Sequence, residues 1–286
     1  MSESPASSFT LSFEVFPPKT EEGATKLMAV IGTLADKNPD FISITSGAGG
    51  GPISEKTHEL VARAREAFPH LSIAPHLPMT RQSREQLQTT LRHYLGLGVK
   101  TIIAIRGDPS SVPGDEHPGD AYPNTVDYVR DLRHAFGVEP IVGAYPDVHP
   151  MAQSPQQDLD HLKRKADAGA RRAITQFFFE PDTFLRFRDK ANAATQGRLA
   201  LIPGIMPIQN FDQIAGFAKR CGARVPDSVT QRFHRHGGDA SALFEEGVAH
   251  GSELCRAMLR EGVSAFHFYT LNHPEMTFRI VSALRA

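Results

Sequence analysis

The strongest constraint on the fold is a regular alternation between short β-like runs and longer amphipathic stretches. Eight runs rich in apolar, β-branched and aromatic residues recur along the chain, at 11–16, 41–45, 72–77, 101–107, 140–145, 172–179, 200–206 and 265–271. Between them lie stretches with apolar residues at the three- and four-residue spacing typical of helices, among them 21–37, 84–98, 155–170 and 211–222. Such alternation indicates a parallel sheet, and eight units in 286 residues favour a closed barrel. We therefore predict an α/β fold, a (β/α)8 TIM barrel, with residues 1–286 forming a single domain.

Charge and cysteine content limit the kinds of partner and compartment. The chain carries 31 Lys and Arg against 32 Asp and Glu, so it has no excess positive charge for nucleic acid or an anionic membrane. No run approaches the ~18 uninterrupted apolar residues of a membrane span, and the first residues do not resemble a signal peptide. Cys221 and Cys255 have no metal-site or redox spacing. We expect a cytoplasmic protein with two inert thiols, no nucleic-acid or membrane partner, and a homo-oligomeric state.

Two connections are longer than a barrel requires. Residues 108–125 follow the fourth run, and residues 222–240 interrupt the helical region between the seventh and eighth runs. Because the loops after barrel strands surround the ligand-binding mouth, each connection is a candidate lid, with an ordinary surface excursion as the alternative. Phe233, in the second connection, could offer a stacking surface to a ligand or could simply fold onto the barrel.

Polar side chains stand at the ends of nearly all the predicted strands. They are Glu14, Thr45, His76, Arg106, Asp108, Tyr145, His149, Gln176 and Tyr269. The C-terminal ends of barrel strands meet at one mouth, so residues that are distant in the sequence become neighbours there. The sequence therefore predicts one ligand site that is built from many segments.

Glu14 is the candidate acid or base of this site. It lies between apolar neighbours in "LSFEVFPPKT", so its carboxyl group points either into the barrel or away from it. Burial inside the barrel would raise its pKa toward neutrality and allow proton exchange near pH 7. The alternative is an internal ion pair with Lys19 or Arg106.

Groups suited to an anionic or heterocyclic ligand follow the fourth strand and the fifth. In "AIRGDPSS", Gly107 permits close backbone approach, Arg106 can bind a phosphate and Asp108 can accept N–H groups of a heterocycle; a turn with a local salt bridge is the alternative. In "QQDLDHLKRKADAGA", one helical face is expected to carry Asp158, His161 and Lys165, with Arg164 beside them. That face could hold a ribityl chain and phosphates, or it could be a solvated, ion-paired surface.

Two further polar residues are candidates for ligand binding. Gln176 offers a donor and an acceptor to a heterocycle edge, between aromatic neighbours, while His76 is either a ligand-binding or a core histidine.

Several sequence motifs of other enzyme classes are absent. The thirteen histidines lack the spacing of a catalytic metal site, so we expect no catalytic metal. The sequence also lacks the glycine-rich signatures of Rossmann and P-loop sites and the nucleophile elbow of hydrolases.

Several segments together resemble one enzyme family, the flavoprotein methylenetetrahydrofolate reductases of the bacterial single-domain type. The resemblance runs from about Phe9 to the C-terminus. In chain order, the segments that carry it are "SFEVFPPK", "APHL", "AIRGD", "AYPDVHP", "DLDHLKRKADAGARRAITQFFFE", "IPGIMPI" and "EGVSAFHFYTLN".

The resemblance implies a (β/α)8 barrel that binds FAD at its mouth and takes electrons from NADH or NADPH. It implies reduction of 5,10-methylenetetrahydrofolate, a small-molecule substrate, to 5-methyltetrahydrofolate. In that scheme Glu14 is the general acid that opens the folate imidazolidine ring, and Asp108 contacts the pterin and tunes the flavin. Gln176 hydrogen-bonds the pterin, and Phe233 packs on the bound folate or nicotinamide. The positions that resemble the FAD site are Thr45, His76, Arg106, Gly107, Asp108, Tyr145, Asp158, His161, Arg164 and Lys165.

The sequence also departs from the family pattern. Ser46 stands where a tyrosine is usual, His273 where an arginine is common and His161 where an asparagine is common, and the chain begins only a few residues before its first strand. The first two changes remove an aromatic surface and a positive charge near the mouth, which would weaken binding of NAD(P)H or the folate tail. Two alternatives therefore stay open: a barrel that acts mainly as a 5-methyltetrahydrofolate oxidase or uses another electron donor, and a non-catalytic folate-binding barrel.

Overall fold

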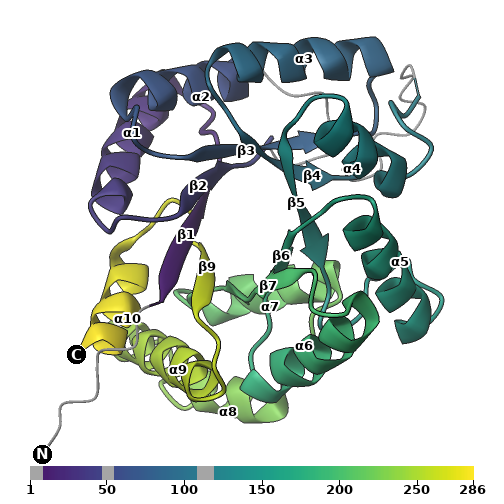
Figure 1. Ribbon diagram of the computed structural model, residues 1–286. Helices are drawn as coiled ribbons and strands as arrows, with labels where there is room; N and C mark the ends of the chain where they lie inside the picture. The colour runs from purple at the N-terminus through teal and green to yellow at the C-terminus, as the bar shows by residue number, and fades with distance from the viewer. Residues whose placement is uncertain (1–8, 47–54, 108–118) are drawn as a thin grey trace, which may run out of the picture.

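A computed structural model describes residues 9–46, 55–107 and 119–286, and it confirms the predicted single-domain α/β barrel (Figure 1). Within these residues nine parallel strands form one sheet that is ringed by helices. The strands are β1 (Thr10–Val15), β2 (Phe41–Ile44), β3 (Ile73–Pro78), β4 (Thr101–Ile105), β5 (Glu139–Ala144), β6 (Arg172–Thr175), β7 (Ala200–Ile202), β8 (Gly204–Ile205) and β9 (Ala265–Tyr269). The helices are α1 (Glu21–Ala35), α2 (Glu55–Ala67), α3 (Arg84–Gly96), α4 (Thr125–His134), α5 (Pro155–Asp167), α6 (Pro181–Thr195), α7 (Phe211–Cys221), α8 (Asp227–His234), α9 (Ala240–Arg260) and α10 (Glu275–Arg285).

The seventh predicted strand is split in two, and this split closes the barrel. The strand order is β7-β6-β5-β4-β3-β2-β1-β9-β8, so β7 pairs with β6 while β8 pairs with β9 on the other side. Pro203 separates the two pieces because it has no N–H group to donate to a strand ladder. At the seam a Cβ atom on Gly204 would lie 2.2 Å from the carbonyl oxygen of Thr175, so only glycine allows this close approach.

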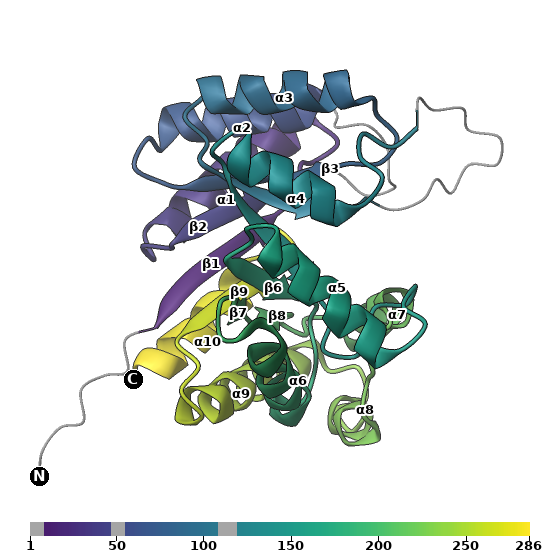
Figure 2. The ribbon, with the colours of Figure 1, turned by 45° about the vertical axis from the view of Figure 1, so that its right-hand side comes forward.

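Side-chain caps begin several helices at the predicted places. Ser83 and Gln86 form a reciprocal capping box at the start of α3, and Ser154 accepts the Gln157 N–H at the start of α5. These caps satisfy N–H groups that the first helical turn leaves without partners. They fix the residue at which α3 and α5, both labelled in Figure 2, begin.

Phe233 was predicted to lie in a loop, but the structure places it in a helix. It belongs to α8, is 1% exposed, and stacks on Phe211 of α7 with ring centroids 5.3 Å apart. Both rings belong to a second apolar cluster that fills the space beneath α7 and α8, together with Phe177 and Phe179. The predicted strand 172–179 also ends early, at Thr175, and the phenylalanines that follow it pack into the core from a loop.

A buried carboxylate joins α8 to α9. Glu246 is 7% exposed, and its carboxylate contacts Arg232, Arg235 and His236, the last at 2.8 Å. Burial alone raises the pKa of Glu246, but its interactions with His236, Arg232 and Arg235 outweigh burial and lower the pKa to about 2.

We expect Glu246→Gln to destabilise the protein at neutral pH. Because the folded-state pKa lies below the usual 4.5, the ionised carboxylate stabilises the fold above about pH 4.5, and this stabilisation is lost as the pH falls toward 2. The variant should therefore lose about 3 kcal/mol of unfolding free energy at pH 7, and its difference from wild type should shrink on acidification. Urea denaturation at several pH values measures this difference. Glu245→Gln, which removes an exposed partner of Arg279, is the matched control and should change little.

Candidate functional site

Two adjoining cavities open at the C-terminal mouth of the barrel. The mouth pocket, about 320 Å³, lies over the barrel axis and includes Glu14, His76 and Gln176 in its lining. The side pocket, about 310 Å³, lies between β4, β5 and α5. Ile105, Gly143 and Tyr145 line both cavities, so the two form one continuous site.

The structure brings most of the predicted site residues into these cavities. Those in the mouth pocket are Glu14, His76, Tyr145, Gln176 and Tyr269. Those in the side pocket are Arg106, Tyr145, His149, Asp158, His161, Arg164 and Lys165. Thr45 lies at the end of β2, where its N–H donates to Val15, and it does not line either cavity. Phe233 lines neither, and Asp108 lies outside the described residues.

Glu14 points into the barrel and contacts two imidazoles. Its Oε2 lies 3.2 Å from Nε2 of His76 and 3.9 Å from Nε2 of His267, and its side chain is 21% exposed. Within the described part of the chain its ion pairs are therefore with histidines, and not with Lys19 or Arg106. The inward orientation that the sequence left open is thus decided.

The expected rise in the pKa of Glu14 is wrong. Burial does raise this pKa, but interactions with His267 and His76 outweigh burial and lower it to about 2. The expectation rested on burial, with Lys19 or Arg106 as the alternative ion-pair partners, and did not include the two histidines because they come from strands far away in the sequence. In this arrangement the carboxylate form of Glu14 is the favoured one.

His267 is a site residue that the sequence analysis missed. It is fully buried in β9, and its Nδ1 lies 2.9 Å from the hydroxyl oxygen of Ser12 on the neighbouring β1. Burial lowers the pKa of His267, and the Glu14 carboxylate opposes this effect. The strand period could have indicated the residue, since His267 shares its face of the strand with Tyr269. The carboxylate and the two imidazoles together form a cluster that can hold and transfer a proton.

Aromatic side chains form the walls of the mouth pocket. Phe177 and Phe217 line it, and the Tyr269 hydroxyl donates to the carbonyl oxygen of Thr175 at 2.8 Å. Phe217 was also missed, because an aromatic residue on the amphipathic helix α7 is typical of a core position. The pocket thus offers flat apolar surfaces beside the amide of Gln176, which suits a heterocyclic ring.

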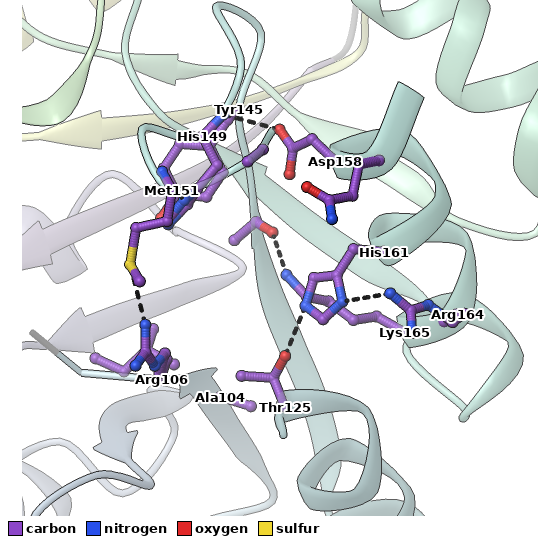
Figure 3. A pocket seen from close by; sticks show the side chains of 14 residues that line it. Ala104, Arg106, Thr125, Tyr145, His149, Met151, Asp158, His161, Arg164 and Lys165 are labelled. Atoms are coloured by element: carbon purple, nitrogen blue, oxygen red, sulfur yellow. Dashed lines mark hydrogen bonds between the residues drawn. The ribbon is translucent and has the colours of Figure 1, made fainter. Parts of the chain in front are cut away.

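Basic and imidazole groups line the side pocket (Figure 3). Lys165 donates to the carbonyl oxygen of Gly143 at 3.1 Å, and burial lowers its pKa to about 8 although Asp158 opposes this effect. His161 lies 2.8 Å from the hydroxyl of Thr125 and 3.4 Å from a guanidinium nitrogen of Arg164. Burial and the nearby cations lower the pKa of His161 to about 4, so this imidazole is neutral at pH 7.

Arg106 lines the side pocket beyond the end of β4, and Gly107 follows it outside both pocket linings. Arg106 extends across it, with a guanidinium nitrogen 3.0 Å from the sulfur of Met151. Gly107 has φ +95, and a Cβ atom there would lie 2.3 Å from the Thr80 hydroxyl. The backbone conformation at Gly107 therefore favours glycine.

No cluster of three or more His, Cys, Asp or Glu in the described residues could hold a metal ion. Cys255 is fully buried and burial raises the pKa of its thiol, whereas Cys221 lies in the lining of the mouth pocket. Across the same described ranges, no helix is both long enough and apolar enough to cross a membrane.

The chain is similar to known reductases over nearly its whole length. The family description "Methylenetetrahydrofolate reductase" matches residues 2–285. The 5,10-methylenetetrahydrofolate reductase of Salmonella typhimurium is 40% identical over 274 residues, covering 96% of this chain and 90% of that protein. The enzyme of the same description from Escherichia coli is 39% identical with the same coverage.

Solved structures with much lower identity share the fold. A Clostridium thermocellum protein that binds two copies of 5-methyl-5,6,7,8-tetrahydrofolic acid aligns with a TM-score of 0.63 at 12% identity, over 97% of this chain and 95% of that one. Dihydropteroate synthase from Xanthomonas albilineans, in complex with 7,8-dihydropteroate, aligns with a TM-score of 0.54 at 14% identity, over 98% and 91%.

Proposed function

The chain belongs to the methylenetetrahydrofolate reductase family of oxidoreductases, and from that premise we propose that it reduces 5,10-methylenetetrahydrofolate to 5-methyltetrahydrofolate, with bound FAD and electrons from NADH or NADPH. One observation carries the proposal: the Glu14–His76–His267 cluster lies at the mouth of a barrel whose adjoining cavity is cationic. The site thus combines a proton-transferring group with a place for an anionic cofactor.

The side pocket suits the phosphates and sugar-like chain of FAD. Arg106, Arg164 and Lys165 supply positive charge for a pyrophosphate, and Asp158 can accept hydroxyl groups. Tyr145 lies where the two cavities meet, so a flavin ring placed there would face the mouth pocket. When bound, FAD supplies the hydride-transfer chemistry, and the protein supplies binding and orientation. For Asp108 and Thr45 the proposed roles rest on the family resemblance.

The mouth pocket suits the pterin ring of a folate. Gln176 can donate to and accept from the edge of the heterocycle, while Phe177 and Phe217 cover its faces. The Clostridium thermocellum protein shows that a barrel of this fold can bind a methylated tetrahydrofolate. In place of Phe233, we propose that Phe217 is the aromatic side chain that packs on the substrate.

Opening the imidazolidine ring requires a proton at nitrogen while positive charge develops next to it. Glu14 can deliver that proton and remain as a carboxylate close to the new cation. The contacts with His76 and His267 favour the carboxylate and so favour this direction of transfer. Because they also make the unloaded carboxyl group acidic, we propose that Glu14 takes up its proton only when the substrate occupies the mouth pocket.

We expect the purified protein to show the visible absorbance of oxidised flavin. Rapid mixing with NADH or NADPH should bleach that absorbance, and methylenetetrahydrofolate should restore it. His273 is exposed at the rim, at a position where the family commonly has arginine. The missing positive charge would weaken binding of the nicotinamide donor, and this is the specific observation that favours the oxidase alternative. Bleaching by 5-methyltetrahydrofolate but by neither nicotinamide would favour that alternative. A colourless protein with folate affinity would favour a non-catalytic barrel.

A further inference from the structure

The sheet ladder between β1 and β9 ends at the position of the candidate acid. The last paired residues are Glu14 on β1 and Tyr269 on β9. Beyond this pair, hydrogen bonds from the segment 270–272 replace those of the regular strand ladder. The Thr270 hydroxyl donates to the carbonyl oxygen of Glu14 at 2.7 Å, and the Thr270 N–H donates to the same oxygen at 3.3 Å.

Asn272 continues this connection at Phe16, two residues after Glu14 and directly beyond the end of β1. Its Oδ1 accepts the N–H of Phe16 at 3.0 Å, and its Nδ2 donates to the carbonyl oxygen of Phe16 at 2.9 Å. The Asn272 N–H donates in turn to the Thr270 hydroxyl at 3.2 Å. One amide side chain therefore satisfies both backbone groups of Phe16, as a neighbouring strand would.

The backbone of this segment is bent to allow the connection. Leu271 and Asn272 have φ values of 50 and 61, in the left-handed region that non-glycine residues rarely adopt. Such a conformation costs about 1 kcal/mol or more per residue, so other interactions must hold it. Thr270 is 1% exposed, so its hydroxyl has no competing water.

The hydrogen bonds from Thr270 and Asn272 to Glu14 and Phe16 form a clamp, and this clamp fixes the position of the Glu14 side chain. The groups that face its carboxylate are His76 from β3, and His267 and Tyr269 from β9. Because the contact with His76 is 3.2 Å, a shift of β1 by a fraction of an ångström would change it. The clamp holds β1 beyond the end of its ladder with β9, on the side where the substrate would lie.

We propose that Thr270 and Asn272 are positioning residues, which hold the end of β1 so that Glu14 faces the imidazoles and the reacting nitrogen of the substrate. This inference rests on the proposed function for its catalytic meaning. Its geometric content is independent of that function: without the clamp, Glu14 loses its fixed contact with His76.

Two variants remove the clamp with little other disturbance. Thr270→Val keeps the shape of the side chain and removes the hydroxyl that binds Glu14. Asn272→Gly removes the amide and still adopts a positive φ without strain. Thr270→Ser keeps the hydroxyl and should restore function. The matched control is Thr195→Val, which removes an equally buried hydroxyl that donates to the carbonyl oxygen of Ala191 at 2.7 Å in α6.

We expect the two clamp variants to lower kcat of folate reduction about 10- to 100-fold, since small misplacements of a catalytic group have effects of this order. The KM for folate and the rate of flavin reduction should stay within about two-fold of wild type, as should all rates of Thr270→Ser and Thr195→Val. Equal losses in both half-reactions, or unchanged folate reduction in both clamp variants, would overturn the inference.

A second measurement tests the clamp even if the wild-type protein does not reduce folate, an outcome that would refute only the proposed function. Carbon-13 NMR titration of the Glu14 carboxyl group reports its contact with the imidazoles directly. In Thr270→Val and Asn272→Gly the pKa of Glu14 should move toward the ordinary 4.5, and in Thr195→Val it should not move. An unchanged titration in both clamp variants would overturn the inference.

Discussion

Glu14→Gln is expected to reduce folate turnover by about 10²–10⁴-fold and to leave flavin content and flavin reduction by the nicotinamide donor near wild-type values. The substitution keeps the shape of the side chain and removes both the transferable proton and the negative charge. Its carboxylate is the group that contacts His76 and His267 in the mouth pocket, whereas the cationic side pocket does not include it. The two half-reactions should therefore separate.

Stopped-flow measurement of each half-reaction provides the test. The reductive half-reaction is followed by loss of flavin absorbance with NADH or NADPH, and the oxidative half-reaction by its return with methylenetetrahydrofolate. Glu139→Gln is a suitable control, since Glu139 binds Arg172 at the start of β5 and lies in neither pocket lining. If Glu14→Gln slowed both half-reactions equally, Glu14 would be a structural residue instead of an acid.

The fold was predictable because it depends on local patterns. Period-2 apolar runs and amphipathic stretches alternate strictly, and this alternation is visible without any knowledge of contacts. The split at Pro203 was not predicted, because it depends on which strands β7 and β8 pair with, and these partners lie on opposite sides of the seam. A proline within an apolar run was the available signal.

The location of the site was also predictable, because the ends of all barrel strands converge. Its electrostatics were not. The pKa of Glu14 depends on His76 and His267, which lie 62 and 253 residues further along the chain and approach Glu14 only through strand pairing. Burial was foreseen as the cause that raises the pKa, but the sequence does not indicate which side chains face the carboxylate.

The two aromatic assignments show the same limit. Phe217 and Phe233 both lie on amphipathic helices at apolar spacing, so their sequence environments do not distinguish them. Only the packing of α8 onto α7 turns Phe233 into the second cluster, while Phe217 reaches the mouth pocket. A helical pattern gives the buried face of a helix but does not show which cavity borders that face.

Lys165→Met is expected to lower the affinity for FAD about 10- to 100-fold and to yield largely colourless protein. Lys165 is held in the side pocket by the carbonyl oxygen of Gly143, with Asp158 close by, and its ammonium group can pair with a phosphate. Methionine keeps most of the length of the side chain and removes the charge. Lys163→Met is the matched control, because Lys163 lies two residues away on α5 and pairs with Asp167 on an exposed surface.

The same residue gives the FAD affinity a defined dependence on pH. Burial lowers the pKa of Lys165 to about 8, so its positive charge is present below that pH and is lost as the pH rises through it. An anionic ligand stabilises the charged form, so affinity should be constant up to about pH 8 and then fall, by up to ten-fold per pH unit. Equilibrium titration of the protein with FAD measures this pH dependence. The titrations run from pH 6 to pH 10, about two pH units on either side of that pKa. The wild-type protein and Lys163→Met should show the fall and Lys165→Met should not; a wild-type affinity that is flat across pH 8 would mean that this ammonium group does not contact the cofactor.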